Sequence, residues 1–387
     1  MRRTLAALLA VPLAAALASA QVDVPGDFAT VQAALDASPP NSTIVVHGGT
    51  WTPITISKPV TLVGDPIATF SNTDIGAGTL KPSIRLTGPG SGRVELVQVA
   101  TSGSAGGPIN GAAGEGIAGS GFDALWILRS DIHAAQWGLV NGVAFAVAGV
   151  KTTTIPFVLV SSSTIQGGNS KVDNPALTKG FPGGAGVNAT GATVVAIGST
   201  IVGGQGMDAS YDAGVTPPGL CPCAGVFNTG GTGVVATSLF SSGSSISGGP
   251  GGNVYTKPGP FGPLTFWDVP ASGAATSVSS STVLPVTLTQ SGSTHLGANW
   301  SLAWPSGELS FIAIGAEAWS PQFFPAVGWS FADWSAVYVA SVFDASAPTG
   351  ITLTIPPVPH FAGAVVVAQA WTLSGGFSNA IIEPLLP

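Results

Sequence analysis

The chain has 387 residues, of which only 7% are charged, and it contains 54 glycines and 31 prolines. Typical soluble domains carry about 25% charged residues. A hydrophobic content of 45% is nevertheless enough to bury a core, which excludes a disordered chain. The formal net charge of −7 repels phosphate backbones, so the composition argues against a nucleic-acid partner.

The first twenty residues have the order of a secretory signal peptide. Basic Arg2 and Arg3 precede an apolar run at 5–17, and three small residues at 18–20 precede Gln21. The apolar run is too short to span a bilayer. We therefore expect cleavage after Ala20, a secreted or cell-surface location, and no membrane span in the mature chain. Cleavage removes two of the eleven basic residues, which leaves nine against eighteen acidic ones and a net charge near −9.

Residues 24–65 predict a short helix followed by three short strands. Asp27 can N-cap the helix, and Pro39 and Pro40 end it. Runs of β-branched residues follow at 44–46, 54–56 and 60–63. One amphipathic helix ahead of closely spaced strands is what an end-capped solenoid requires, because the first coil would otherwise expose its core and its strand edges.

This segment resembles the N-terminal coil of the pectin lyase-like right-handed β-helix superfamily. The resemblance covers about forty residues, with the helix, the turn Gly48-Gly49 and the strand Lys58-Pro-Val-Thr-Leu-Val-Gly. It implies a right-handed parallel β-helix with a capping helix. It implies little about activity, because the motif forms the cap and first coil rather than a catalytic groove.

Internal repeats predict the same fold independently. One pattern, Ser-polar-Ile, recurs around Ile132, Ile165, Ile201 and Ile246, and Gly-Gly follows the last three copies. The isoleucines lie 33, 36 and 45 positions apart, and a solenoid tolerates such uneven spacing because insertions project as loops. We expect residues 21–265 to form one parallel β-helix in which these isoleucines point inward.

Beyond the repeats the pattern changes. Residues 266–282, rich in Ser, Ala and Thr, read as a linker. Alternating runs predict a β-sandwich over 283–387, with strands at 283–289, 309–314, 337–342, 351–355 and 365–370. The segment 363–381 is similar to C-terminal domains appended to secreted bacterial proteins, planctomycete ones especially, and this resemblance implies attachment or stabilisation. The whole chain is therefore expected to be all-β.

The densest group of candidate catalytic residues surrounds Trp126. It consists of Asp123, Arg129, Asp131 and His133. On a straight strand the last three would share one face and supply an acid, a base and a positive charge. The repeat alignment favours another interpretation, in which Asp131 and His133 occupy a variable, solvated outer face because other coils carry Thr, Gln, Ser or Val there.

Two further sites are weaker candidates. Asp208 and Asp212 could help to bind Ca²⁺, but two carboxylates are few for an ion that takes six to eight oxygen ligands, so a polar loop is the simpler interpretation. Cys221 and Cys223 flank one proline and lack a second Cys pair or a nearby His, which argues against a zinc site. In an oxidising compartment they are expected to form a small disulfide ring, with free thiols as the alternative.

Two functions remain open from the sequence. The first is a non-enzymatic extracellular or cell-surface protein that needs no cofactor and binds polysaccharide or cell-wall glycan. Seven of the ten tryptophans lie from Trp267 onward and could stack on sugars, although core filling is their commoner use. The second is a polysaccharide lyase or glycoside hydrolase, which would need Ca²⁺ or a carboxylate pair. Acidic residues are so sparse between 101 and 257 that the first is favoured.

Overall fold

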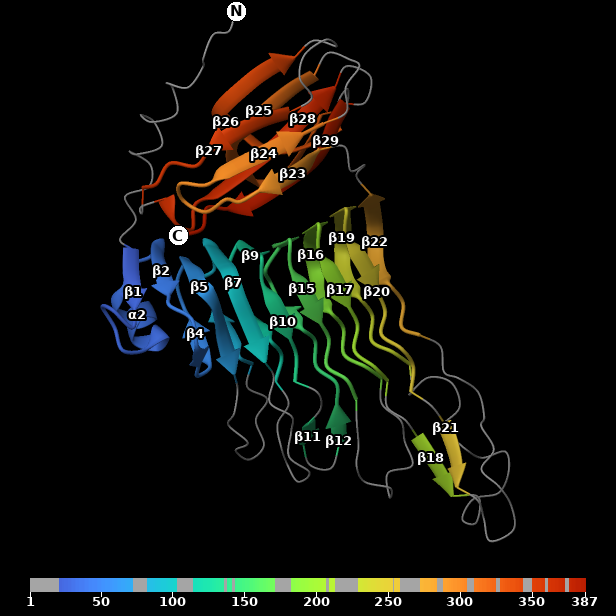
Figure 1. Ribbon diagram of the computed structural model, residues 1–387. Helices are drawn as coiled ribbons and strands as arrows, with labels where there is room; N and C mark the ends of the chain where they lie inside the picture. Colours follow the sequence, from blue (N-terminus) through green and yellow to red (C-terminus); the bar gives the residue numbers. More distant parts are fainter. Residues whose placement is uncertain are drawn as a thin grey trace, which may run out of the picture.

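Most of the chain is β-structure, and its largest element is a parallel sheet that curls around an apolar interior (Figure 1). The computed structural model describes residues 21–71, 82–102, 114–135, 138–140, 143–170, 182–206, 209–212, 229–252, 254–257, 272–283, 288–304, 310–324, 328–343, 350–358, 361–372 and 376–387. Eighteen of the described strands belong to the curled sheet.

The strands of the curled sheet stack in three series, which we call faces A, B and C in the order in which each coil visits them. Face A contains β4 (Ile54–Ile56), β6 (Ile84–Thr87), β8 (Ile117–Ser120), β13 (Val150–Thr152) and the first parts of β16 (Val187–Ile197), β19 (Val234–Ser242) and β22 (Thr276–Val283). Face B contains β1 (Gln21–Val24), β2 (Ser42–Val46), the first parts of β5 (Val60–Ser71) and β7 (Arg93–Ser102), β9 (Ala124–Leu128), β14 (Phe157–Ser161) and the second parts of β16, β19 and β22. Face C contains β3 (Thr50–Trp51), the second parts of β5 and β7, β10 (Asp131–His133), β15 (Thr164–Gln166), β17 (Thr200–Val202) and β20 (Ser245–Ser247).

The repeat isoleucines stack on face C as predicted. Ile132, Ile165, Ile201 and Ile246 are direct partners in successive parallel pairs. The first three side chains are fully buried, and Ile246, in the last coil of this face, is only partly buried against the core. Stacked, inward-pointing isoleucines at uneven sequence spacing are compatible with the expected solenoid, because the extra residues leave the strand register unchanged.

The Gly-Gly pairs of the repeats form a seam that the repeat pattern alone does not predict. Beyond faces A and C, backbone N–H groups donate to carbonyl oxygens in one continuous series, at 2.7–2.9 Å, through Val147, Gly168, Gly184, Gly204, Gly231, Gly249 and Gly273. A Cβ added at Gly204 would lie 1.9 Å from the carbonyl oxygen of Gly168. Only glycine fits at such a separation, so two layers of chain meet here without side chains.

The N-terminal helix, α2 (Val31–Ala37), packs Val31, Ala34 and Leu35 onto the interior of the curled sheet. Its N-cap is Thr30, whose hydroxyl accepts a hydrogen bond from the backbone N–H of Ala33, and not Asp27 as expected. The carboxylate of Asp27 instead accepts a bond at 2.9 Å from the backbone N–H of Asp23, which closes a turn ahead of the helix. This is the one α-helix in the described part of the chain, and it is far too short to cross a membrane.

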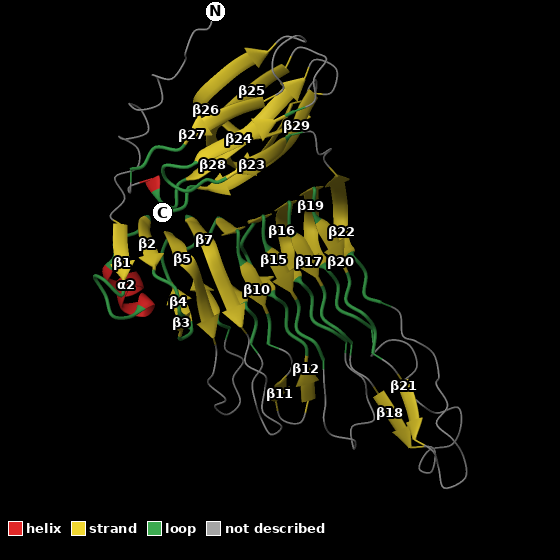
Figure 2. Cartoon of the chain, viewed as in Figure 1, coloured by secondary structure: helices red, strands yellow, loops and turns green. Residues whose placement is uncertain are grey.

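The curled sheet extends further than the sequence indicates. Strand β22 lies almost wholly within the segment 266–282 expected to be a linker, yet it pairs in parallel with β19 from Thr276 to Val283. Two smaller pairs project on the side away from the C-terminal strands (Figure 2): β11 (Gly138–Val140) with β12 (Val143–Phe145), and β18 (Ala209–Asp212) with β21 (Val254–Lys257).

The C-terminal part contains two antiparallel sheets, in agreement with the predicted sandwich. One sheet has three strands, β23 (Thr289–Gly292), β24 (Asn299–Ala303) and β27 (Gly350–Thr354). The other has four strands in the order β26 (Gly328–Phe343), β25 (Ser310–Phe324), β28 (Val365–Thr372) and β29 (Gly376–Pro384). Side chains of both sheets, including Trp300, Trp304 and Ile312, share one buried cluster.

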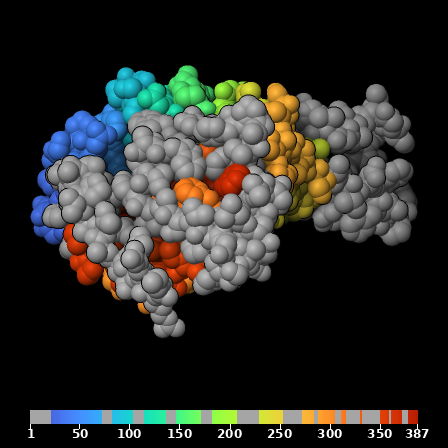
Figure 3. Space-filling model, turned by 90° about the horizontal axis from the view of Figure 1, so that it is seen from above, coloured from blue at the N-terminus to red at the C-terminus, as the bar shows by residue number. Residues whose placement is uncertain are grey.

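The sandwich packs on the outer side of face B. A second buried cluster joins the two parts; its members are Val45, Val63, Val97, Ala124, Trp126, Leu128, Phe157, Leu159, Val195, Ile197 and Phe240 from face B, and Phe331, Val367, Ala380, Ile382 and Leu386 from the sandwich. The view from above shows the orange and red C-terminal residues against the row of coils (Figure 3). Face B is therefore covered on its outer side from β2 to β19.

Candidate functional site

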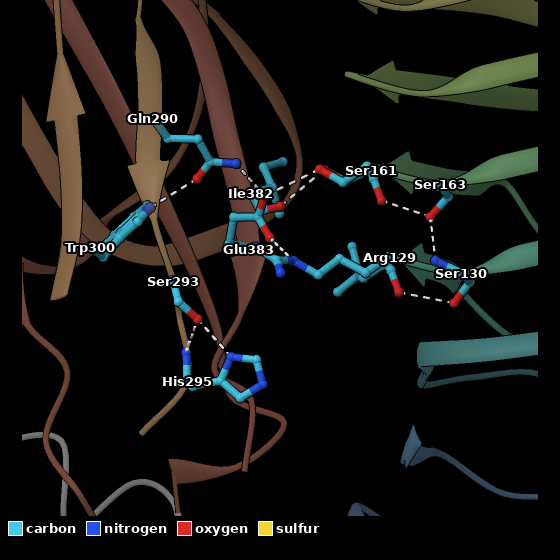
Figure 4. A network of polar contacts seen from close by, with 12 residues as sticks. Arg129, Ser130, Ser161, Ser163, Gln290, Ser293, His295, Trp300, Ile382 and Glu383 are labelled. Carbon is cyan, nitrogen blue, oxygen red and sulfur yellow. Dashed lines mark hydrogen bonds and ion pairs between the residues drawn. The ribbon is translucent and has the colours of Figure 1, made fainter. Parts of the chain in front are cut away.

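A polar network lies within the apolar contact between face B and the sandwich, and its centre is Glu383 on β29 (Figure 4). The Glu383 side chain is 1% exposed, and one carboxylate oxygen lies 2.5 Å from Nε of Arg129. The other oxygen accepts hydrogen bonds from the hydroxyl of Ser162, at 3.1 Å, and from the side-chain amide of Gln290. Each oxygen thus has a donor, as a buried carboxylate requires.

The network continues into the core of the sandwich. The side-chain oxygen of Gln290 accepts a hydrogen bond at 2.8 Å from the indole Nε1 of Trp300, which is 2% exposed. On the other side, the hydroxyl of Ser161 donates at 2.9 Å to the backbone carbonyl of Ile382. Hydrogen bonds and one ion pair therefore connect the curled sheet, through Glu383, to a core tryptophan of the sandwich.

Arg129 reaches Glu383 because the chain bends at that residue. Its φ of 49° lies in the left-handed region, and the equivalent bends in the next coils fall at Ser162, Gly198 and Gly243, with φ of 50°, 54° and 58°. A residue other than glycine costs roughly 1–2 kcal/mol in this conformation. The two coils that place Arg and Ser at this bend are the two whose side chains bind Glu383.

A ladder of serines, buried at Ser130, Ser163 and Ser199 and half-buried at Ser244, stacks directly after these bends. The hydroxyls of Ser130, Ser163, Ser199 and Ser244 each donate to the carbonyl two residues earlier, at 2.7–3.2 Å. Each hydroxyl also accepts from a backbone N–H of the preceding coil, as Ser163 does from Ser130 at 3.0 Å. The serine of the repeat therefore joins adjacent coils, and its recurrence in the Ser-polar-Ile pattern has a structural reason.

The structure separates the four residues that the sequence grouped around Trp126. Asp123 is exposed and accepts a hydrogen bond at 2.8 Å from the backbone N–H of Gly92 in a turn. Arg129 points to the sandwich. Asp131 and His133 lie after the bend, on the outer side of face C, where His133 Nε2 is 2.9 Å from the Asp131 carboxylate. The straight strand that would have aligned three of them does not exist, because the left-handed bend at Arg129 interrupts it.

Asp131 and His133 belong to the solvated outer face that the repeat alignment indicates. Their side chains are 51% and 40% exposed. Asp131 stacks in register with the exposed residues Thr164, Thr200 and Ser245 of the next three coils. Face C thus presents a column of short polar side chains at the spacing of neighbouring strands, about 4.8 Å.

The other candidate residues fall largely outside the described part of the chain. Asp208, Cys221 and Cys223 lie outside it, as do residues 1–20, and Asp212 is described only as the last residue of β18. No group of three or more His, Cys, Asp or Glu side chains that could hold a metal ion occurs within the described ranges. Trp300 and Trp304 are core residues, 2% and 6% exposed, so neither is a platform for a sugar ring.

The Glu383 network cannot act on an external substrate in this arrangement, since its groups are turned to one another inside a contact between two parts of the chain. It can fix the position of the sandwich on the coils. Comparison with known proteins adds no assignment: no protein-family model matches the sequence, and no curated protein matches it.

Proposed function

We propose that this chain is an exported, non-enzymatic structural protein of the extracellular space or cell surface. The observation that carries the proposal is the ion pair between Arg129 and the buried Glu383 within the apolar contact, because it fastens the sandwich to the coils in one orientation. Two parts held in this way make one stiff body. The signal peptide expected at 1–20 supports export, and mass spectrometry of exported material should find Gln21 as the first residue.

The body is best interpreted as a right-handed parallel β-helix of the pectin lyase-like kind. In-register parallel pairing through three faces supports this, and so does the resemblance of residues 24–65 to the first coil of that superfamily. Helix α2 covers the apolar interior at the N-terminal end, where no earlier coil precedes face A in the described chain. We propose that it is the cap of the solenoid.

The partner we propose is a neutral polysaccharide lying along face C. The column of Thr164, Thr200 and Ser245 offers hydroxyls that both donate and accept hydrogen bonds, as sugar hydroxyls do. Apart from the Asp131–His133 pair, the outward residues of β10, β15, β17 and β20 carry no charge, so nothing there selects a charged polymer. We therefore propose glycan contact on the coils rather than on Trp300 and Trp304, which are buried.

The test combines binding with product analysis. Purified protein is mixed with insoluble neutral glucans and with pectate, alginate and chondroitin, with and without Ca²⁺, while retention, unsaturated products and reducing ends are followed. We expect retention on a neutral glycan without turnover, and weaker retention of the Thr164→Ala/Thr200→Ala double variant. Thr190→Ala, at an exposed position of β16 between its face A and face B parts, is the matched control and should bind normally. Equal binding by all three proteins would contradict the placement on face C.

A polysaccharide-active enzyme is the alternative, and the exposed Asp131–His133 pair favours it because an acid and a base lie 2.9 Å apart on an open face. Turnover that is lost in both Asp131→Asn and His133→Gln would establish it. Arg129 is unsuitable for this test, because its replacement disturbs the contact with the sandwich.

A further inference from the structure

The two ends of the curled sheet differ in how far they are covered. At the N-terminal end the short strand β1 and helix α2 cover the interior, and Val24, Val31 and Leu35 join the buried cluster of the coils. At the other end the last strand is β22, which pairs with β19 and with no other described strand. Figures 1 and 2 show β22 at the end of the row of coils.

Strand β22 has none of the features that usually protect a free edge. It is eight residues long, Thr-Ser-Val-Ser-Ser-Ser-Thr-Val, with no charge and no proline, and five of its residues are exposed. Natural edge strands are commonly short, charged, interrupted by proline or covered, because an open row of N–H and C=O groups pairs readily with another strand. This edge is therefore built to accept a strand.

Apolar side chains of the last described coil are also less buried than those of the coils before it. Val283 lies two residues after Ser281, which pairs with the buried Leu239, so the strand register assigns Val283 to the inner side of face B. Its side chain is nevertheless 77% exposed. Ile246, the last isoleucine of the stack, is only partly buried, whereas Ile201 before it is fully buried. The terminal repeats of a solenoid need a cover over such exposed apolar side chains.

We propose that two copies of the chain join tail to tail, with β22 pairing antiparallel with β22 of the second copy. The strand passes from face A to face B close to Ser279, so a two-fold axis at that bend exchanges its two halves and keeps both copies in contact. Self-pairing of an uncharged strand meets no like-charge repulsion. Self-pairing also gives hydrogen-bond partners to the backbone N–H and C=O groups of β22, and it covers Val283 and Ile246. Closed two-fold dimers are the commonest homo-oligomers.

The experiment measures the mass of the purified protein in solution by sedimentation equilibrium over a range of concentrations. We expect twice the chain mass of 38.2 kDa, less the twofold mass of any cleaved signal peptide. Ser279→Lys places two lysines next to the axis, and because like charges on opposed strands repel, dimerisation should weaken about fivefold or more. Ser279→Glu should do the same. An equimolar mixture of the two variants should dimerise again, which a folding defect would not allow.

Thr164→Lys is the matched control, since it makes the same change on an exposed position of β15, a strand paired on both sides. It should leave the dimer intact. A monomer at every concentration would overturn the proposal, because a segment of the same chain would then cover β22. A series of ever larger species would overturn it in favour of head-to-tail addition. A dimer that persists in Ser279→Lys, or that the mixture fails to restore, would place the interface elsewhere.

Discussion

Replacing Arg129 by Met should loosen the sandwich from the coils. The change keeps most of the side-chain volume and removes the guanidinium that lies 2.5 Å from the Glu383 carboxylate. Glu383 would remain 1% exposed with Ser162 and Gln290 as its donors. Removing one partner of a buried ion pair costs about 3–5 kcal/mol, and because Arg129 itself is 29% exposed we expect the lower end, about 3 kcal/mol.

The Asp131–His133 pair provides a matched control, because its 2.9 Å separation is similar while its side chains are 51% and 40% exposed. Asp131→Asn should cost no more than about 1 kcal/mol, as exposed pairs do. Urea unfolding followed by tryptophan fluorescence and by far-UV circular dichroism measures both variants. Glu383→Gln should be milder than Arg129→Met, since it leaves no buried charge unpaired, and the double variant should cost less than the two single effects added. Equal stabilities for Arg129→Met and Asp131→Asn would refute this account of the interface.

Three further substitutions test other parts of the structure. Gly363→Ala should separate the sandwich from the coils and raise the radius of gyration in small-angle scattering, because its Cβ would lie 2.9 Å from Cγ2 of Val63. Gly297→Ala is the control, since this glycine has the same φ of 82° but open surroundings. A similar rise in the radius of gyration for Gly297→Ala would show that backbone strain alone, and not the contact with Val63, causes the change. Ser163→Ala should lower the free energy of unfolding by about 1–3 kcal/mol, because the buried N–H of Ser130 loses its acceptor. Ser245→Ala, at an exposed position, should change the free energy of unfolding little. Equal effects of the two changes would argue against a stabilising role of the serine ladder. Ile165→Ala should cost about 2–5 kcal/mol in chemical denaturation, and Ile246→Ala clearly less, unless the last coil is as well packed as the others.

The sequence predicted the stacked coils because their signal is local and repeated. Ile132, Ile165 and Ile201 recur with the same neighbours, and each needs only the next coil as its partner. The role of Arg129 could not be found in this way, because its partner lies 254 positions away in a part of the chain with no repeat. The left-handed bend at Arg129 has no sequence mark either, since the glycines that would show it occur only at Gly198 and Gly243.

A signal for the covered face was nevertheless present. The segment Ala124–Leu128 is apolar at every position and is buried at every position, whereas a strand with one solvated side alternates. The run Phe157–Ser161 is similar. Two such strands in adjacent coils indicate a sheet covered on its outer side, and the Trp-rich part that follows is the available cover. The same reasoning explains why the sequence grouping around Trp126 failed: Trp126 is an interface residue, 1% exposed.

The contact between face B and the sandwich also sets the order in which the molecule can be completed. Residues that cover the first coils are among the last to be synthesised: Glu383 follows Arg129 by 254 positions, which at about 5–20 residues per second is a delay of roughly 13–50 s. Until the sandwich has been synthesised, the outer side of face B, with Trp126, Leu128 and Leu159, lacks the cover that the sandwich provides in the folded protein. A nascent chain in this condition is prone to aggregate, so correct folding depends on keeping the early coils unfolded or chaperoned until β29 has been synthesised.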